Sequence, residues 1–150
     1  MMAVRRLKPD DLDAVIALDK AITGRSRRGY FETRLAAALR EPSAHVQYAV
    51  EDDRGLAGFV LAHLLSGEYG RGEQVLALEV IDVAPGRRRQ GVGRQLLGAL
   101  EGEMGRIGIK EILTEASWTD HELLRFLTAA GFELAPRQVI ECAVALADQL

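Results

Sequence analysis

The succession of predicted elements favours an α/β (α+β) fold, in which a mixed sheet of about seven strands is flanked by about four helices. Three observations predict this class. Stretches with strand-like alternation and stretches with helical periodicity follow each other along the chain. Apolar residues make up 48% of the 150 residues, which is enough for a buried core. No linker-like stretch divides the sequence, so we expect a single domain over residues 1–150.

The first part of the chain predicts one strand and two helices. Residues 4–7 form the short strand. Pro9 suits the first turn of a helix, and the two acids after it favour the positive end of the helix dipole. A break rich in Arg and Gly at residues 24–29 ends that helix, and the apolar spacing predicts a second helix over residues 30–39.

Strands dominate the middle of the chain. From His45 the alternation of Val46, Tyr48 and Val50 predicts a strand, and the Asp-Asp-Arg-Gly sequence at residues 52–55 after it is a hairpin signal. A strongly apolar strand over residues 56–65 follows. A flexible loop over residues 66–72 leads to a further strand over residues 74–83, which Pro-Gly then closes.

The last part of the chain predicts two helices and three strands. Helical periodicity covers residues 91–107, and a short strand over residues 111–114 follows. Thr119 or Asp120 can cap a helix that reaches residue 130 and stops at a glycine. The final strands are predicted at residues 132–134 and 139–146.

Composition disfavours several classes of protein. Lys plus Arg number 19 and Asp plus Glu 22, a net charge of −3, and aromatic residues are only 5%, so we expect no nucleic-acid partner. No apolar run approaches the ~20 residues that span a bilayer, and the first residues do not resemble a secretory leader. Cys142, the one cysteine, favours a reducing compartment, so we expect a cytoplasmic protein, and we expect this thiol to be buried. The three histidines are too scattered to suggest a metal site.

Positive charge gathers where the third predicted helix begins. Residues 86–110 contain six basic and two acidic side chains, and the sequence Arg-Arg-Arg-Gln-Gly-Val-Gly over residues 87–93 follows a strand and opens a helix. A helix N-terminus offers unpaired N–H groups, and glycine lets a ligand oxygen approach the backbone. The segment therefore predicts a diphosphate site. It lacks the Gly-Lys-Ser/Thr of a P-loop, and Leu96 stands where a dinucleotide fingerprint needs its third glycine.

Two motifs resemble those of a known family. Arg88-x-x-Gly91-x-Gly93, preceded by Val-Ala-Pro, resembles the acyl-CoA signature of the GNAT superfamily of N-acetyltransferases. A late helix that ends in Gly131-Phe132 is similar to a second family element. The resemblance implies transfer of an acetyl group from acetyl-CoA, without a metal, to a primary amine of a small molecule, peptide or protein. The amine would attack directly in a ternary complex.

The resemblance also implies where the donor lies. The CoA pyrophosphate would be held by backbone N–H groups at the helix start, and the pantetheine arm would pair with residues 79–83 like an extra strand. A bulge commonly splays that strand from the next one in this family. The donor-binding residues so implied are Ile81, Asp82, Val83, Arg88, Arg89, Gln90, Gly91, Val92, Gly93, Arg94 and Asp120.

Glu79 is the candidate base, because an ammonium must lose a proton before it can attack. Many family members carry an acid at this position. In a strand, Glu79 shares a face with Ile81 and Val83, while Asp82 points to the opposite face. The alternative is an exposed strand acid. The family tyrosine that protonates the leaving thiolate is replaced by Leu127, so the general acid is left open between Tyr30, Tyr69, Ser117 and water.

The acceptor side gives conflicting indications. The family usually frames its acceptor with the first two helices and the loop after the third strand, which implies Arg25, Arg28, Tyr30 and Tyr69 as substrate-binding residues. The arginines suit an anionic group, whereas acids in the loop at residues 66–73 suit a cationic amine. A solvated, mobile loop is the alternative reading of the arginines. Apolar residues near the C-terminus are compatible with a homodimer. The second functional hypothesis is a non-catalytic acyl-CoA-binding or regulatory module.

Overall fold

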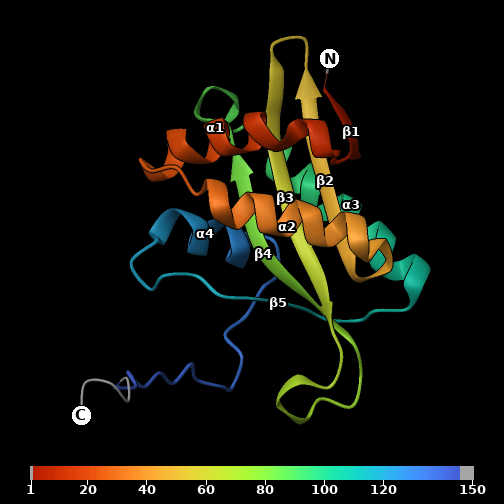
Figure 1. Ribbon diagram of the computed structural model, residues 1–150, viewed down its shortest axis with the longest axis vertical. Coiled ribbons are helices and arrows are strands. Elements are labelled where there is room, and N and C mark those ends of the chain that lie inside the picture. Colours follow the sequence, from red (N-terminus) through yellow and green to blue (C-terminus); the bar gives the residue numbers. More distant parts are fainter. Residues whose placement is uncertain (1, 146–150) are drawn as a thin grey trace. The chain divides into compact units, whose positions relative to one another are not determined.

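A five-stranded sheet is the framework of the first of two units, Met1–Glu115 and Ala116–Leu150 (Figure 1). The computed structural model describes residues 2–145. The strands are β1 (Ala3–Arg6), β2 (His45–Asp52), β3 (Gly55–Leu65), β4 (Val75–Val83) and β5 (Ile112–Thr114). They lie in sequence order and are antiparallel, except that β5 runs parallel to β4. The sheet is therefore mixed, as predicted.

Helices cover both faces of this sheet. α1 (Leu12–Thr23) and α2 (Arg28–Arg40) pack on one face, and α3 (Val92–Ile107) packs on the other (Figure 1). α4 (His121–Ala129) belongs to the second unit, and its cap is Asp120, whose side chain accepts from the N–H of Leu123. These four helices confirm the predicted ones.

Among residues 2–145, the structure corrects the number of strands from about seven to five. Residues 132–134 and 139–145 form no strand, and residue 146 lies outside the described part of the chain. A strand needs a neighbour for its backbone N–H and C=O groups, and among residues 2–145 nothing pairs with these two segments. Alternation of apolar residues does not supply that neighbour. Cys142, predicted to be buried, is exposed for the same reason.

Alternation along β3 distributes its side chains between the two helical layers. Phe59 and Leu61 join the core under α1 and α2, where Phe59 meets the ring of Phe31 edge to face at 5.7 Å between centroids. Gly58 points the other way, toward α3. A Cβ at Gly58 would lie 2.7 Å from Cγ1 of Val92 and 2.8 Å from the main-chain oxygen of Asp82. The missing side chain thus lets the start of α3 lie directly on the sheet.

We expect Gly58→Ala to destabilise the fold by about 1–3 kcal/mol, because the oxygen of Asp82 belongs to the backbone and cannot move aside. Urea unfolding followed by circular dichroism measures the change. Gly102→Ala is the matched control, since an added Cβ there meets nothing within 4 Å. Equal midpoints for the two variants would contradict the packing argument.

Within the described residues, no helix is both long and apolar enough to cross a membrane.

Candidate functional site

A β-bulge places Glu79 at an irregular point of β4. Leu61 of β3 pairs with Val80, and the next residue of β3, Ala62, pairs with Leu78. Glu79 is therefore the extra residue, with no partner of its own across the pair. A bulge bends its strand and re-aims the side chain at that position. The implied irregularity in this strand is present, and it falls on the candidate base.

The pairing between β4 and β5 ends next to this bulge. Their parallel pairing covers Leu76–Leu78 on β4 and ends where Thr114 donates its hydroxyl to the carbonyl of Leu78 at 2.8 Å. Within the described part of the first unit, residues 79–83 have no strand on that side. This leaves an edge of backbone donors and acceptors that an extended ligand can pair with.

The bulge also overturns the predicted distribution of acids on β4. Glu79 contacts side chains of α2, and Asp82 pairs across the sheet with Phe59, whose ring belongs to the core under α1 and α2, so both acids lie on the face that α1 and α2 cover. The prediction that Asp82 points away from the Glu79 face is wrong. An extra residue shifts the two-residue period of a strand, so positions 79 and 82 come to one side.

Three side chains from α2 and β3 contact Glu79 of β4. We call the four residues the Glu79 cluster: Glu79, His63, Tyr30 and Arg34. One carboxylate oxygen of Glu79, Oε1, lies 2.6 Å from Nδ1 of His63. The other, Oε2, accepts from the hydroxyl of Tyr30 at 3.1 Å and pairs with Nη2 of Arg34 at 2.7 Å. Burial, with the charge and hydrogen bond of Glu79, raises the pKa of Tyr30. Glu79 is thus a held carboxylate, not an exposed strand acid.

A second polar group beside β4 is fully buried. Asp19 is 0% exposed and accepts two hydrogen bonds from Arg27, at 2.7 and 2.8 Å. Oδ2 of Asp82 is buried and meets no donor among the described residues. Two carboxyls share a hydrogen bond only when one is protonated, and burial, followed by the hydrogen bond and charge of Asp19, raises the pKa of Asp82 to about 8. Arg27 opposes the effect of burial on Asp19 and lowers the pKa of that carboxyl.

The raised pKa of Asp82 makes folding stability depend on pH. Between the ordinary value of 3.8 and about 8, the folded chain holds a proton that the unfolded chain has lost. Asp82 therefore favours the folded state most at low pH, and this contribution is lost as the pH rises toward 8. We expect the melting temperature to fall between pH 5.5 and 8.5 in the wild type and to fall less in Asp82→Asn, by differential scanning fluorimetry. Asp53→Asn, an exposed change, should behave as the wild type. Parallel curves for Asp82→Asn and wild type would contradict this prediction.

The segment between β4 and α3 has the geometry of an anion site. Arg89 has φ +65° and Gly91 φ +79°, so the chain turns twice through the left-handed region before α3 begins. Gly91 is the N-cap, no side chain caps the helix, and the N–H of Gln95 is the one that bonds back to the carbonyl of Gly91. The N–H groups of residues 92–94 therefore belong to the uncapped first turn. Such a turn binds phosphate oxygens.

Arg87 is not one of the arginines available to bind a phosphate. Its guanidinium pairs with both carboxylate oxygens of Asp52, at 2.8 and 2.9 Å, and both side chains are largely buried. The pair ties the β2–β3 hairpin to the segment before α3, and the hydrogen bonds from Arg87 hold the pKa of Asp52 far below its usual range. Arg87 thus anchors the loop that Arg88 and Arg89 continue.

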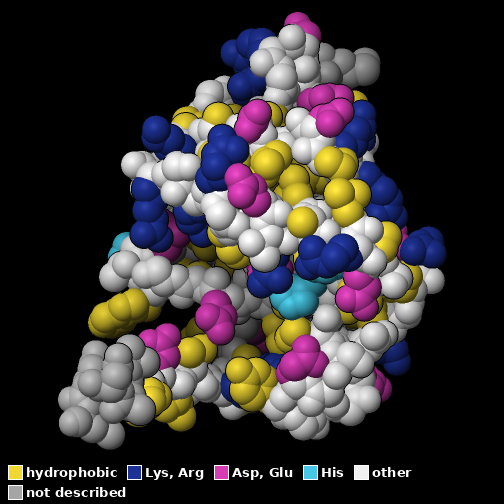
Figure 2. Space-filling view, viewed as in Figure 1, with side chains coloured by type: hydrophobic (Ala, Val, Ile, Leu, Met, Phe, Trp, Pro, Cys, Tyr) yellow, Lys and Arg dark blue, Asp and Glu magenta, His cyan; other side chains and the backbone are white. Residues whose placement is uncertain are grey.

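The predicted acceptor residues are not all brought together. Tyr30 joins the Glu79 cluster, whereas Arg28 is exposed and pairs with Asp13 at 3.3 Å. Arg25 lies in the exposed turn before α2, and Tyr69 is 96% exposed in the β3–β4 loop. None of these three contacts the Glu79 cluster. Over α1 and α2, Lys and Arg side chains are spread across the visible face of the first unit (Figure 2).

Sequence reasoning missed two members of the cluster, Arg34 and His63. Arg34 stands one helical turn after Tyr30, a spacing that puts both side chains on one helix face. That spacing is a usable signal. His63 gives none, because its approach to Glu79 depends on the β3–β4 register.

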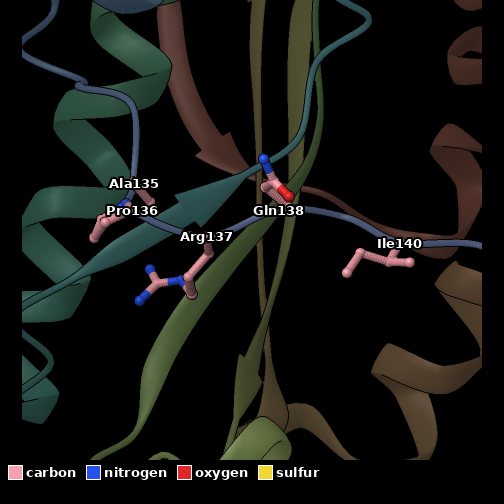
Figure 3. Close-up of a pocket in the computed structure, with 5 residues that line it drawn as sticks. All are labelled: Ala135, Pro136, Arg137, Gln138 and Ile140. Atoms are coloured by element: carbon pink, nitrogen blue, oxygen red, sulfur yellow. The ribbon is translucent and has the colours of Figure 1, made fainter.

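The second unit offers no comparable chemistry. Five residues of one irregular segment, Ala135, Pro136, Arg137, Gln138 and Ile140, line an open depression there (Figure 3). In residues 2–145, no group of three or more His, Cys, Asp or Glu side chains is arranged to hold a metal ion. The candidate site is therefore built on β4, the start of α3 and the Glu79 cluster.

Comparison with known proteins gives one family and many similar folds. The sequence profile described as the acetyltransferase (GNAT) family matches residues 12–132. No curated protein matches the chain. Aminoglycoside N-acetyltransferase AAC(6')-Iy in complex with CoA is 20% identical, with a TM-score of 0.80 over 97% of this chain and 96% of that one.

Two further structures show the range of proteins with this fold. The ribosomal-protein-S18-alanine N-acetyltransferase from Escherichia coli is 19% identical, with a TM-score of 0.74 over 90% of this chain and 79% of that one. A transcriptional regulator from Bacillus halodurans C-125 is 15% identical, with a TM-score of 0.79 over 96% of this chain and 100% of that one. At such identities these likenesses establish the fold alone.

Proposed function

Because the chain belongs to the acetyltransferase (GNAT) family, we propose that it transfers the acetyl group of acetyl-CoA to a primary amine. The observation that carries this proposal is the continuity of two features. The open edge of β4 at residues 79–83 leads through a short turn into the uncapped start of α3. One extended ligand with a diphosphate at its end fits both.

The donor's groups match the two features in chemistry as well as in order. The pantetheine arm carries amides, which can pair with the backbone of Ile81 and Val83. Its pyrophosphate would accept from the N–H groups of Gly91, Val92 and Gly93, beside the charges of Arg88, Arg89 and Arg94. The side chain of Asp82 is buried against Asp19, so Asp82 contributes main chain only. Gln90 completes the proposed set in the first unit, whereas Asp120, which the resemblance also implied, lies in the second unit and caps α4 there.

The Glu79 cluster would remove the proton from the acceptor's ammonium group. The amine then attacks the thioester carbonyl, the C–S bond breaks, and CoA leaves as a thiolate that takes up a proton. Leu127 cannot donate that proton. Of the side chains considered for this step, Tyr30 is in the cluster, whereas Ser117 bonds to Thr119 and Tyr69 is exposed.

The acceptor is proposed only as a primary amine. Structural neighbours named for aminoglycosides and for a ribosomal-protein alanine support testing sugar amines and peptide N-termini alike. The exposed thiol of Cys142 supports the proposal of a reducing, cytoplasmic setting. The homodimer remains a prediction that light scattering tests.

A second candidate is a module that binds acyl-CoA without turnover. Leu127, which stands where the family has its proton-donating tyrosine, favours it. An acceptor screen separates the two: the chain is incubated with acetyl-CoA and a panel of amino acids, polyamines, aminoglycosides and peptides. CoA release with a mass gain of one acetyl group on an amine supports catalysis. Saturable acetyl-CoA binding with no product across the panel would support the module.

A further inference from the structure

The contacts of Glu79 leave its neighbour His63 as the group best placed to take up a proton. Oε1 of Glu79 faces His63, and Oε2 is shared by Tyr30 and Arg34, so three of about four acceptor positions of the carboxylate are occupied. Its charge is also matched by Arg34. The side chain of Glu79 is 15% exposed, whereas that of His63 is 25% exposed.

The hydrogen bond between the two residues sets the state of the imidazole. A carboxylate only accepts, so Nδ1 of His63 carries the hydrogen at 2.6 Å from Oε1. In the neutral ring the other nitrogen, Nε2, then holds a lone pair. No hydrogen bond to Nε2 is found among the described residues.

A second imidazole lies close to His63. The ring of His45 on β2 lies 6.1 Å away, and burial, followed by the charges of His63 and Arg34, lowers the pKa of His45. His45 therefore stays neutral and does not compete for the proton. The other charged or titratable groups facing His63 are Glu79 on β4, with Tyr30 and Arg34 on α2, and Glu41 lies near His45.

The position of the ring fits the proposed reaction. His63 alternates with Phe59 and Leu61 along β3, so it lies on the face covered by α1 and α2, and its partner across the sheet is Ala77. This is the end of the paired part of β4, next to the edge proposed for the donor. The acceptor, framed by α1 and α2, would approach from the same face.

We propose that Nε2 of His63 accepts the proton from the acceptor's ammonium group, and that Glu79 orients the ring and balances the charge of the imidazolium formed. This proposal rests on the proposed function. One N–H bond of the ammonium breaks and its proton passes to Nε2. The free amine forms the C–N bond, the C–S bond breaks, and the second proton from nitrogen accompanies the thiolate as CoA thiol. The imidazolium then returns its proton to solvent.

Two measurements on the full chain test the proposal. Long-range ¹H–¹⁵N correlation spectra identify which ring nitrogen of His63 carries hydrogen, without any need for activity. We expect the Nδ1–H form at neutral pH. An Nε2–H form would overturn the proposal.

The kinetic measurement uses His63→Gln with His45→Gln as the matched control. We expect His63→Gln to lower kcat/KM by about 100-fold and to abolish the acid limb of its pH profile, with unchanged acetyl-CoA binding. His45→Gln should keep the limb. A wild-type limb in His63→Gln, in a folded protein, would make Glu79 the direct base and overturn the proposal alone. A wild type that binds acetyl-CoA and acetylates nothing would overturn the proposed function as well.

Discussion

Replacing Glu79 with glutamine is expected to lower kcat by about 100-fold or more, because the site then lacks the negative charge that assists removal of the proton from the ammonium group. The acetyl-CoA dissociation constant should change by less than about twofold, since the proposed donor contacts use main chain at residues 81–83 and the start of α3. Steady-state kinetics with a responsive acceptor and calorimetric titration with acetyl-CoA measure the two quantities.

The control for Glu79→Gln tests whether the loss of any carboxylate, and not only of the one at the site, changes the two constants. Glu101→Gln removes an exposed carboxylate from α3 and should leave both constants unchanged. Glutamine also removes the negative charge that Arg34 pairs with at 2.7 Å, so a modest loss of stability is expected and is read from the melting temperature. Full turnover in a well-folded Glu79→Gln would refute a role for the charge of Glu79 in proton removal.

The parts of the site that depend on local sequence could be predicted. A short segment of sequence indicates the start of α3, because it has a glycine at the N-cap, arginines before it and apolar spacing after it. The same holds for the start of β2 (His45–Asp52), which lies at His45 as the alternation predicts, while the strand extends into the first residue of the predicted turn. Asp120 as the cap of α4 also follows from local chemistry, because its side chain bonds only three residues ahead.

The parts that depend on pairing between distant segments could not be predicted. A single extra residue at Glu79 puts Asp82 on the unexpected face. The sequence of β4 alone does not indicate that Glu79 is the residue left unpaired with β3. Arg34 and His63 reach Glu79 from α2 and β3, which meet only in the folded unit. The two final predicted strands fail for a related reason, since alternation at residues 139–145 does not provide a neighbouring strand.

The anion site at the start of α3 depends on conformation as well as on charge, so Gly91→Val should weaken acetyl-CoA binding by about 100-fold, or roughly 2.7 kcal/mol. Gly91 has φ +79°, a region that a β-branched residue adopts only with strain. The variant would have to rebuild the turn, and the N–H groups of residues 91–94 would no longer converge on one anion. Isothermal titration with acetyl-CoA measures the loss.

Gly98→Val is the matched control, because it adds the same side chain to the same helix at an exposed position where a Cβ meets nothing within 4 Å. It should bind acetyl-CoA as the wild type does, and its stability should not fall, since glycine is a poor helix former. Dephospho-CoA keeps the pyrophosphate and lacks the 3′-phosphate, so it should lose affinity in Gly91→Val by the same factor as acetyl-CoA. A smaller loss for dephospho-CoA would place the 3′-phosphate, and not the pyrophosphate, at the start of α3. Equal affinities of Gly91→Val and Gly98→Val would exclude the left-handed turn from donor binding altogether.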